Sequence, residues 1–239
     1  MMDGARFAAL CRASGEGMPY PDLTAPQERV LVDALRAAWD RLRAAYGGVL
    51  AQWSEDQTTE RLEAQLNALL DDEAVAGFSR EFIGVAREPK VVNHDGHHPD
   101  KMPDLAFSLR RREPGLRADY SLHVECKPVN RRDGMSPYCD QDGMGKFIRG
   151  DYACKMRAGF MVAYAADGYT FAGKVAPKLR RSFNKAGDPY ATTRLVDAAQ
   201  TPESQHHRSW VYANGSAPGD IRLLHVWLTV AAPGPLTAR

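Results

Sequence analysis

Two acidic residues and a lysine lie on neighbouring segments whose sequence alternates between apolar and polar side chains. Residues 102–110 (MPDLAFSLR) and 118–129 (ADYSLHVECKPV) both show this period of two, which is typical of half-buried strands. Side chains two positions apart on a strand point the same way, so Glu125 and Lys127 share one face. If the two strands pair as a hairpin, Asp104 lies near Glu125. Two carboxylates and one ammonium group would then meet on a single polar patch.

Hydrolysis of a phosphodiester bond is a reaction that uses this combination. Mg²⁺ takes one or two carboxylates, waters and phosphate oxygens as ligands, and it polarises the phosphoryl oxygen and activates a water. Asp104 and Glu125 would supply the carboxylates, with the backbone carbonyl of Cys126 as a further candidate ligand. Lys127 would orient or deprotonate the attacking water, or neutralise charge on the phosphate. The alternative is an ordinary surface ion-pair cluster, which the spacing and the strand phase disfavour.

The elements around these residues follow from hydrophobic periodicity. Helices are expected at 25–46, after the N-cap residue Thr24, at 56–71 and at 143–157, with a short helix at 174–185. Strands are expected at 82–92 (or two short strands broken at Pro89), 102–110, 118–129, 159–165 and 221–230, and loops at 93–102, 130–142 and 200–219. Pro114-Gly115 predicts a hairpin turn. From 56 to 165 the order is helix, three strands, helix, strand, which predicts an α/β sandwich with a mixed sheet.

The residues around Asp104, Glu125 and Lys127 resemble the signature of a known superfamily. Pro103-Asp104, followed after twenty residues by Glu125-Cys126-Lys127, is similar to the PD…(D/E)xK signature of restriction-endonuclease-like nucleases. The resemblance covers about 60–165, under half of the chain, and implies an αβββαβ core with N-terminal helical and C-terminal strand additions. Pro99-Asp100 is a second Pro-Asp pair, but it lies in the expected loop and lacks the alternation that follows Asp104.

The same resemblance implies further site residues. Members of the superfamily often carry a metal-binding glutamate on the first core helix, where Glu60 and Glu63 are the candidates and Glu60 is preferred. Solvated helix glutamates are the alternative. On the expected helix 143–157, Lys146, Arg149 and Tyr152 correspond to polar residues that approach the active centre, with phosphate contact as the role of the two cations. The chain has Lys146 where several relatives have glutamine.

The overall charge does not by itself indicate a nucleic-acid partner. The net charge is only +1, so contact with a polyanion would depend on local segregation of charge. Cations gather at Arg131-Arg132 and at Lys178, Arg180 and Arg181, which makes these five residues candidates for nucleic-acid binding, although ordinary solvated faces are the alternative. The cluster of His94, His97 and His98 is interpreted as a polar loop, because no cysteine or further histidine stands at a partner spacing.

We therefore expect a phosphodiesterase that depends on Mg²⁺ or Mn²⁺ and cleaves internally rather than from an end. A preference for DNA over RNA, and a role in restriction, phage defence or repair with a homodimer or a defence-system protein as partner, are implied by the resemblance alone. The alternatives are a ribonuclease, a catalytically inactive nucleic-acid-binding module of the same fold, and an α/β interaction protein of a larger complex. A nuclease would show cleavage that EDTA abolishes, whereas the binding module would bind DNA without cutting it. The interaction protein would show no salt-sensitive binding of DNA.

The domain organisation is expected to be simple. Residues 1–55 form a helical extension packed on a core at 56–239, which makes one domain overall, because no long linker divides the chain. The four cysteines form no CxxC pair, which predicts reduced thiols. The first residues lack the apolar core of a signal peptide, and no apolar run reaches membrane-spanning length. We expect a soluble cytoplasmic protein.

Overall fold

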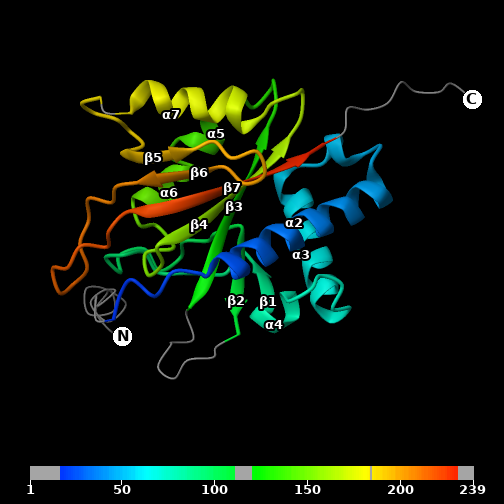
Figure 1. Cartoon of the computed structure of the whole chain (residues 1–239), viewed down its shortest axis with the longest axis horizontal. Helices are drawn as coiled ribbons and strands as arrows, with labels where there is room; N and C mark the ends of the chain where they lie inside the picture. The colour runs from blue at the N-terminus through cyan, green and yellow to red at the C-terminus, as the bar shows by residue number, and fades with distance from the viewer. Residues whose placement is uncertain (1–16, 111–119, 184, 231–239) are drawn as a thin grey trace, which may run out of the picture.

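The computed structural model of the chain describes residues 17–110, 120–183 and 185–230, and its centre is a seven-stranded mixed sheet (Figure 1). The strand order is β1-β2-β3-β4-β7-β6-β5. Strands β3, β4 and β7 run parallel, whereas the remaining pairs are antiparallel. The strands are β1 Phe82–Arg87, β2 Leu105–Leu109, β3 Ser121–Val129, β4 Ala158–Ala165, β5 Thr192–Val196, β6 Glu203–His206 and β7 Ile221–Thr229. The expected α/β class with a mixed sheet is confirmed.

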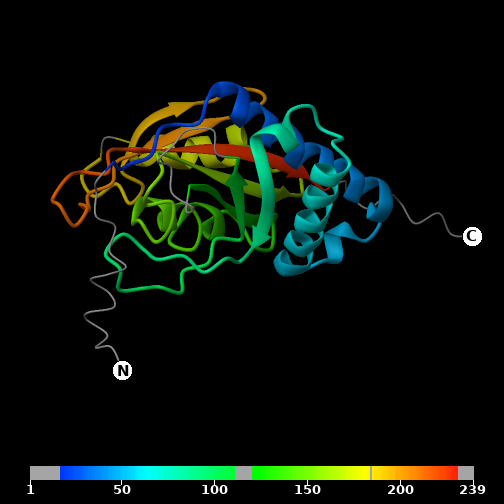
Figure 2. The ribbon, with the colours of Figure 1, turned by 90° about the horizontal axis from the view of Figure 1, so that it is seen from below.

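Helices cover both faces of this sheet. They are α2 Ala25–Tyr46, η1 Leu50–Gln52, α3 Glu55–Asp71, α4 Phe78–Glu81, α5 Ser136–Cys139, α6 Met144–Ile148, η2 Phe171–Val175 and α7 Ala176–Ser182. Helices α2 and α6 both contact β7, and Figure 2 shows α2 on one side of that strand and the α5–α6 region on the other. The expected succession of helix, three strands, helix and strand is present as α3, β1, β2, β3, α6 and β4, with the short helices α4 and α5 added.

The two long helices begin where the sequence provides side-chain caps. Thr24 is the N-cap of α2, as expected, and its side chain accepts a hydrogen bond from the Gln27 amide as part of a capping box. Ser54 and Gln57 form the same motif at the start of α3. This second capping box makes Glu55 the first residue of α3, a position that matters for the site described below.

Several expected elements were wrong in extent. The helix expected at 143–157 ends at Ile148, because Gly150 takes the left-handed conformation (φ 73°) and the chain then continues without regular structure to β4. The strand expected at 82–92 ends at Arg87. A π-helical turn, η2, precedes α7, so that helical stretch starts before residue 174.

Other elements were missed. The loop expected at 200–219 contains β6, and the loop at 130–142 contains α5. Strand β5 was not expected either, because it and β6 are short and have mostly polar sequences (TTRLV and ESQH), and β5 lies at the edge of the sheet. The turn at Pro114-Gly115 lies outside the described residues.

One hydrophobic core joins the N-terminal helices to the sheet. Leu31, Leu35 and Leu42 of α2 belong to the same buried cluster as the apolar residues of β3 and β4. Cys126, Cys139 and Cys154 are buried, and Cys11 lies outside the described residues. Within the described ranges no helix combines the length and apolar character needed to cross a bilayer.

Candidate active site

The antiparallel pairing of β2 with β3 brings Asp104 next to Glu125. Leu105 is the register partner of Val124, so the residue before one and the residue after the other are neighbours across the ladder. The Asp104 carboxylate is fixed there because its Oδ2 accepts a hydrogen bond from the backbone amide of Cys126 at 2.6 Å. The hairpin that the alternating sequence predicts is therefore present, with the expected two carboxylates side by side.

Lys127 lies among three carboxylates. Its Nζ is 2.5 Å from Glu55 Oε1, 3.0 Å from Glu125 Oε1 and 3.7 Å from Asp104 Oδ2. Glu125 and Lys127 share a face of β3, as two positions on a strand should. Glu55 arrives from the first turn of α3, where the helix dipole favours a carboxylate.

Glu125 is the most enclosed member of the group. Besides Lys127, the ammonium of Lys146 contacts its Oε1 at 2.6 Å, and the Tyr152 hydroxyl donates a hydrogen bond to its Oε2. Lys146 comes from α6 and Tyr152 from the irregular segment that follows. The Glu125 side chain is 0% exposed and that of Lys127 is 9% exposed, so the group is not a solvated surface cluster. We call Glu55, Asp104, Glu125, Lys127 and Lys146 the acid–lysine cluster.

The protonation equilibria of the cluster reflect its crowded acids. Burial, followed by the Glu125 charge, raises the pKa of Asp104 to about 6, although Lys127 opposes the shift. Burial also raises the pKa of Glu55 despite the ion pair with Lys127. For Lys127, burial lowers the pKa, but the three carboxylates outweigh it and hold the pKa above its usual range. The surroundings of Lys127 therefore favour its protonated form.

The glutamate that α3 contributes differs from the expected one. Glu60 is exposed, and Glu63 accepts a hydrogen bond from Asn67, whose side chain also bonds the backbone of Val85 in β1. The helix glutamate that contacts Lys127 is Glu55, one residue before the expected start of the helix. The S-x-x-Q capping box at 54–57 is the sequence signal that could have located it, because it places Glu55 in the first turn.

Of the three polar residues expected to approach the site after β3, two contact Glu125 and one does not. Lys146 and Tyr152 join the cluster, whereas Arg149 donates to Gln141 O and pairs with Asp151 at 2.9 Å. Tyr152 was expected on a helix but lies in the irregular segment after α6.

The five surface cations do not act as one group. Arg131 and Arg132 are exposed in the loop after β3, where Arg132 pairs with Asp133. Lys178 pairs with Asp140 at 2.8 Å, Arg180 pairs with Asp197 at 3.4 Å, and Arg181 is exposed. Their role in binding nucleic acid stays a prediction.

The histidine loop forms contacts other than metal ligation. His94 stacks on Trp210 with ring centroids 4.5 Å apart, and His97 contacts Asp95. Over the described ranges, no three His, Cys, Asp or Glu side chains converge closely enough to enclose a metal ion, in this loop or in the acid–lysine cluster.

The donor set of the cluster nevertheless fits a cation that keeps much of its water. Three carboxylates against two ammonium groups leave a formal charge of −1 when all are ionised. Asp104 Oδ1 accepts no hydrogen bond from any described residue, so one hard oxygen has no protein donor. Mg²⁺ needs only one or two carboxylates and does not require a closed protein cage. The Cys126 carbonyl stays a predicted ligand.

Comparisons of the chain with protein-family models, with curated proteins and with solved structures found no match. The functional argument therefore depends on the geometry and chemistry of the site itself.

Proposed function

We propose that the protein is a metal-dependent nuclease that hydrolyses phosphodiester bonds, with the acid–lysine cluster as its active site. The observation that carries this proposal is the meeting of Asp104, Glu125 and Lys127 with Glu55 across three separate elements. A buried group with excess acids and a raised Asp104 pKa is costly to the fold, and such groups concentrate at functional sites.

The fold lends further support to the proposal. The chain order α3, β1, β2, β3, α6, β4 agrees with the αβββαβ core that the resemblance to restriction-endonuclease-like nucleases implies. Asp104 directly precedes β2, and Glu125 and Lys127 lie in β3, which supports the proposal. We propose this fold for the core, with α2 and the strands β5, β6 and β7 as additions.

Each residue of the cluster has a distinct proposed role. Mg²⁺ or Mn²⁺, held by Asp104 and Glu125, would polarise the phosphoryl oxygen and lower the pKa of a water. Lys127, a cation by its surroundings, stabilises the negative charge that develops on the phosphate and does not accept the proton of the water. Glu55 holds the Lys127 ammonium in place. Lys146 and Tyr152 hold the Glu125 carboxylate, which fixes the orientation of a metal ligand.

The test is a cleavage assay on supercoiled plasmid, single-stranded DNA and RNA, with Mg²⁺, Mn²⁺ or EDTA. Wild type is compared with Asp104→Asn, Glu125→Gln and Lys127→Met, with Glu60→Gln as the matched control because that glutamate is exposed on α3. We expect the wild-type protein to cleave and EDTA to abolish this cleavage. Of the four variants, only Glu60→Gln should still cleave. Conversion of the closed circular plasmid to the nicked form would support internal cleavage. The preference for DNA over RNA rests on the resemblance to the superfamily alone.

Two outcomes would overturn the proposal. Salt-sensitive binding of nucleic acid without cleavage in any metal would favour the inactive binding module. Neither binding nor cleavage would favour an interaction protein. Cleavage confined to RNA would keep the mechanism and correct the substrate to that of a ribonuclease.

A further inference from the structure

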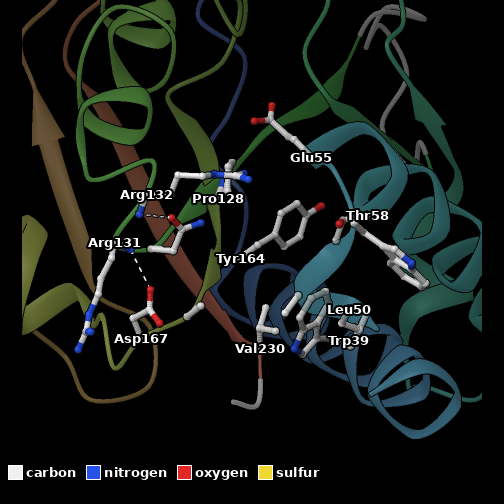
Figure 3. Close-up of a pocket in the computed structure, with 14 residues that line it drawn as sticks. Trp39, Leu50, Glu55, Thr58, Pro128, Arg131, Arg132, Tyr164, Asp167 and Val230 are labelled. Atoms are coloured by element: carbon white, nitrogen blue, oxygen red, sulfur yellow. Dashed lines mark hydrogen bonds between the residues drawn. The ribbon is translucent and has the colours of Figure 1, made fainter. Parts of the chain in front are cut away.

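A pocket of about 340 Å³ adjoins the acid–lysine cluster (Figure 3). On one side it is lined by the ends of β3 and β4 and the residues that follow them, at 128–132 and 164–167, and on the other side by the helical segments α2, η1 and α3. Its volume falls in the range of sites that take small planar ligands. The residues on which the argument depends are Trp39, Ala51, Trp53, Glu55, Arg131 and Tyr164.

The pocket is continuous with the proposed active site. Glu55 lines it and at the same time contacts Lys127, and Pro128, the residue after Lys127, also lines it. A group bound in the pocket is therefore next to whatever binds at the cluster. This continuity makes the pocket a candidate for part of the same substrate.

The apolar wall of the pocket consists of aromatic rings held in fixed positions. Trp39 and Tyr164 stack with ring centroids 5.5 Å apart at 14°, and Trp39 Nε1 donates to Thr229 O while the Tyr164 hydroxyl bonds to Thr59. Trp53 is held by the Arg61 guanidinium, which lies 4.6 Å from the ring centroid. Because Trp39 and Tyr164 are buried and stacked on each other, the half-buried Trp53 is the ring that is left to stack on a flat aromatic ligand, and it is already held in place, which keeps the conformational cost low.

The rim of the pocket is charged. Arg131 and Arg132 line the β3 side, and Figure 3 shows the Arg131 guanidinium pointing outward, away from Tyr164 and Trp39. Arg132 pairs with Asp133, but no acidic side chain of the described residues pairs with the Arg131 guanidinium, since Asp167 accepts only from the Arg131 backbone amide. An aromatic interior with a cation at the mouth complements a base joined to a phosphate, and it does not complement a lipid tail.

We propose that this pocket binds one unstacked nucleobase of the strand whose backbone lies at the acid–lysine cluster, with Arg131 contacting a neighbouring phosphate. The inference rests on the proposed nuclease function and deepens it by naming the substrate form. Bases inside a duplex are stacked on both faces, so a base enters such a pocket only from a single strand or after extrusion. The preferred substrate is therefore single-stranded or locally unpaired nucleic acid.

The test compares two ligands of equal charge in EDTA, so that neither is cut. One is a five-residue thymidine strand and the other is a strand of the same length in which every base is absent. Stacking of a base on an aromatic side chain is worth a factor of about ten or more in affinity. We expect the thymidine strand to bind wild-type protein at least tenfold more tightly than the abasic strand, measured by competition against a labelled oligonucleotide.

Two variants probe the pocket in opposite ways, and a third controls for folding. Trp53→Ala removes part of the aromatic wall, and Ala51→Trp fills the pocket from an exposed position without removing a core contact. Val49→Trp adds the same bulk two residues away at a site that does not line the pocket. We expect the ratio of the affinities for the thymidine strand and the abasic strand to fall to near one in Trp53→Ala and Ala51→Trp. In Val49→Trp this ratio should stay at the wild-type value.

Three results would overturn the inference. These are equal binding of the two strands by wild type, a preference that Ala51→Trp leaves intact, and binding of thymidine monophosphate as tight as that of the five-residue strand. The last result would identify a pocket for a free nucleotide. A base preference that Ala51→Trp abolishes, in a protein that never cleaves, would keep the pocket and reject the nuclease. Metal-dependent cleavage without any preference for the strand that carries bases would support the nuclease and reject the base-binding pocket.

Discussion

The Glu55 carboxylate and the Lys127 ammonium lie 2.5 Å apart although 72 positions of sequence separate them. The first joins the cluster from the start of α3, and the second from the middle of β3. Because Lys127 would lose the shortest of its three contacts with carboxylates and so be held less firmly, we predict that Glu55→Gln lowers the rate of cleavage roughly 10- to 100-fold. Glu60→Gln and Glu63→Gln should stay near wild type in the same assay. A Glu60→Gln defect larger than that of Glu55→Gln would restore the original assignment of the helix glutamate.

Asp104→Asn should separate stability from activity. Burial and the nearby Glu125 charge raise the pKa of Asp104 to about 6, so the ionised form destabilises the fold at neutral pH. Asparagine removes the charge and keeps an oxygen for the Cys126 amide. We expect cleavage to be lost while the free energy of unfolding without metal rises by about 1–3 kcal/mol, measured by urea denaturation. A variant less stable than wild type would contradict this account.

Lys127→Met should make the fold depend on added metal. Removing the ammonium leaves three carboxylates without their shared partner, which costs about 3 kcal/mol or more where charges are buried. A divalent cation can replace the lost charge. We therefore expect a lower melting temperature without metal and a larger rise on adding Mn²⁺ than in wild type. Lys178→Met, which breaks the ion pair with Asp140 elsewhere, should show no added response to Mn²⁺.

The central part of the site could be predicted because it depends on short-range rules. Strand alternation and the pairing of two neighbouring strands are sufficient to bring Asp104, Glu125 and Lys127 together. Glu55 was missed because its position depends on the residue at which α3 begins. Tyr152 reaches Glu125 through an irregular segment that helical periodicity does not describe. Strands β5 and β6 carry polar sequences, so their place in the sheet is set by the pairing of β6 with β7 and of β5 with β6, and by contacts that local patterns do not reveal.

The stability of the protein should fall as the solution becomes acidic. Burial lowers the pKa of His206 and of His123 to about 4, and Nδ1 of His123 accepts a hydrogen bond from the Ala153 amide that a protonated ring could not accept. The unfolded chain binds these protons near pH 6.5, so the stabilisation is complete above that pH and is lost as the pH falls toward 4.

Each of the two histidines should contribute a loss of roughly 3 kcal/mol by pH 4. The measurement is the free energy of unfolding in urea between pH 7.5 and pH 5. The exposed His207 provides the control, since His207→Gln should leave the slope with pH unchanged. A free energy that is constant from pH 7.5 to pH 5 would contradict the lowered pKa values of these two rings.

The close packing of the backbone at Gly143 should determine the position of α6 and therefore of Lys146. A Cβ atom there would lie 2.0 Å from the carbonyl oxygen of Tyr138 and 2.5 Å from that of Pro137, so neither neighbour can yield without moving backbone. Because Gly143 precedes α6, Gly143→Ala should displace the helix that carries Lys146 and loosen its contact with Glu125. We expect a loss of about 2 kcal/mol or more in stability and a fall in cleavage. Gly48→Ala has open space around its Cβ and should change neither, so equal effects of the two substitutions would contradict the close approach at Gly143.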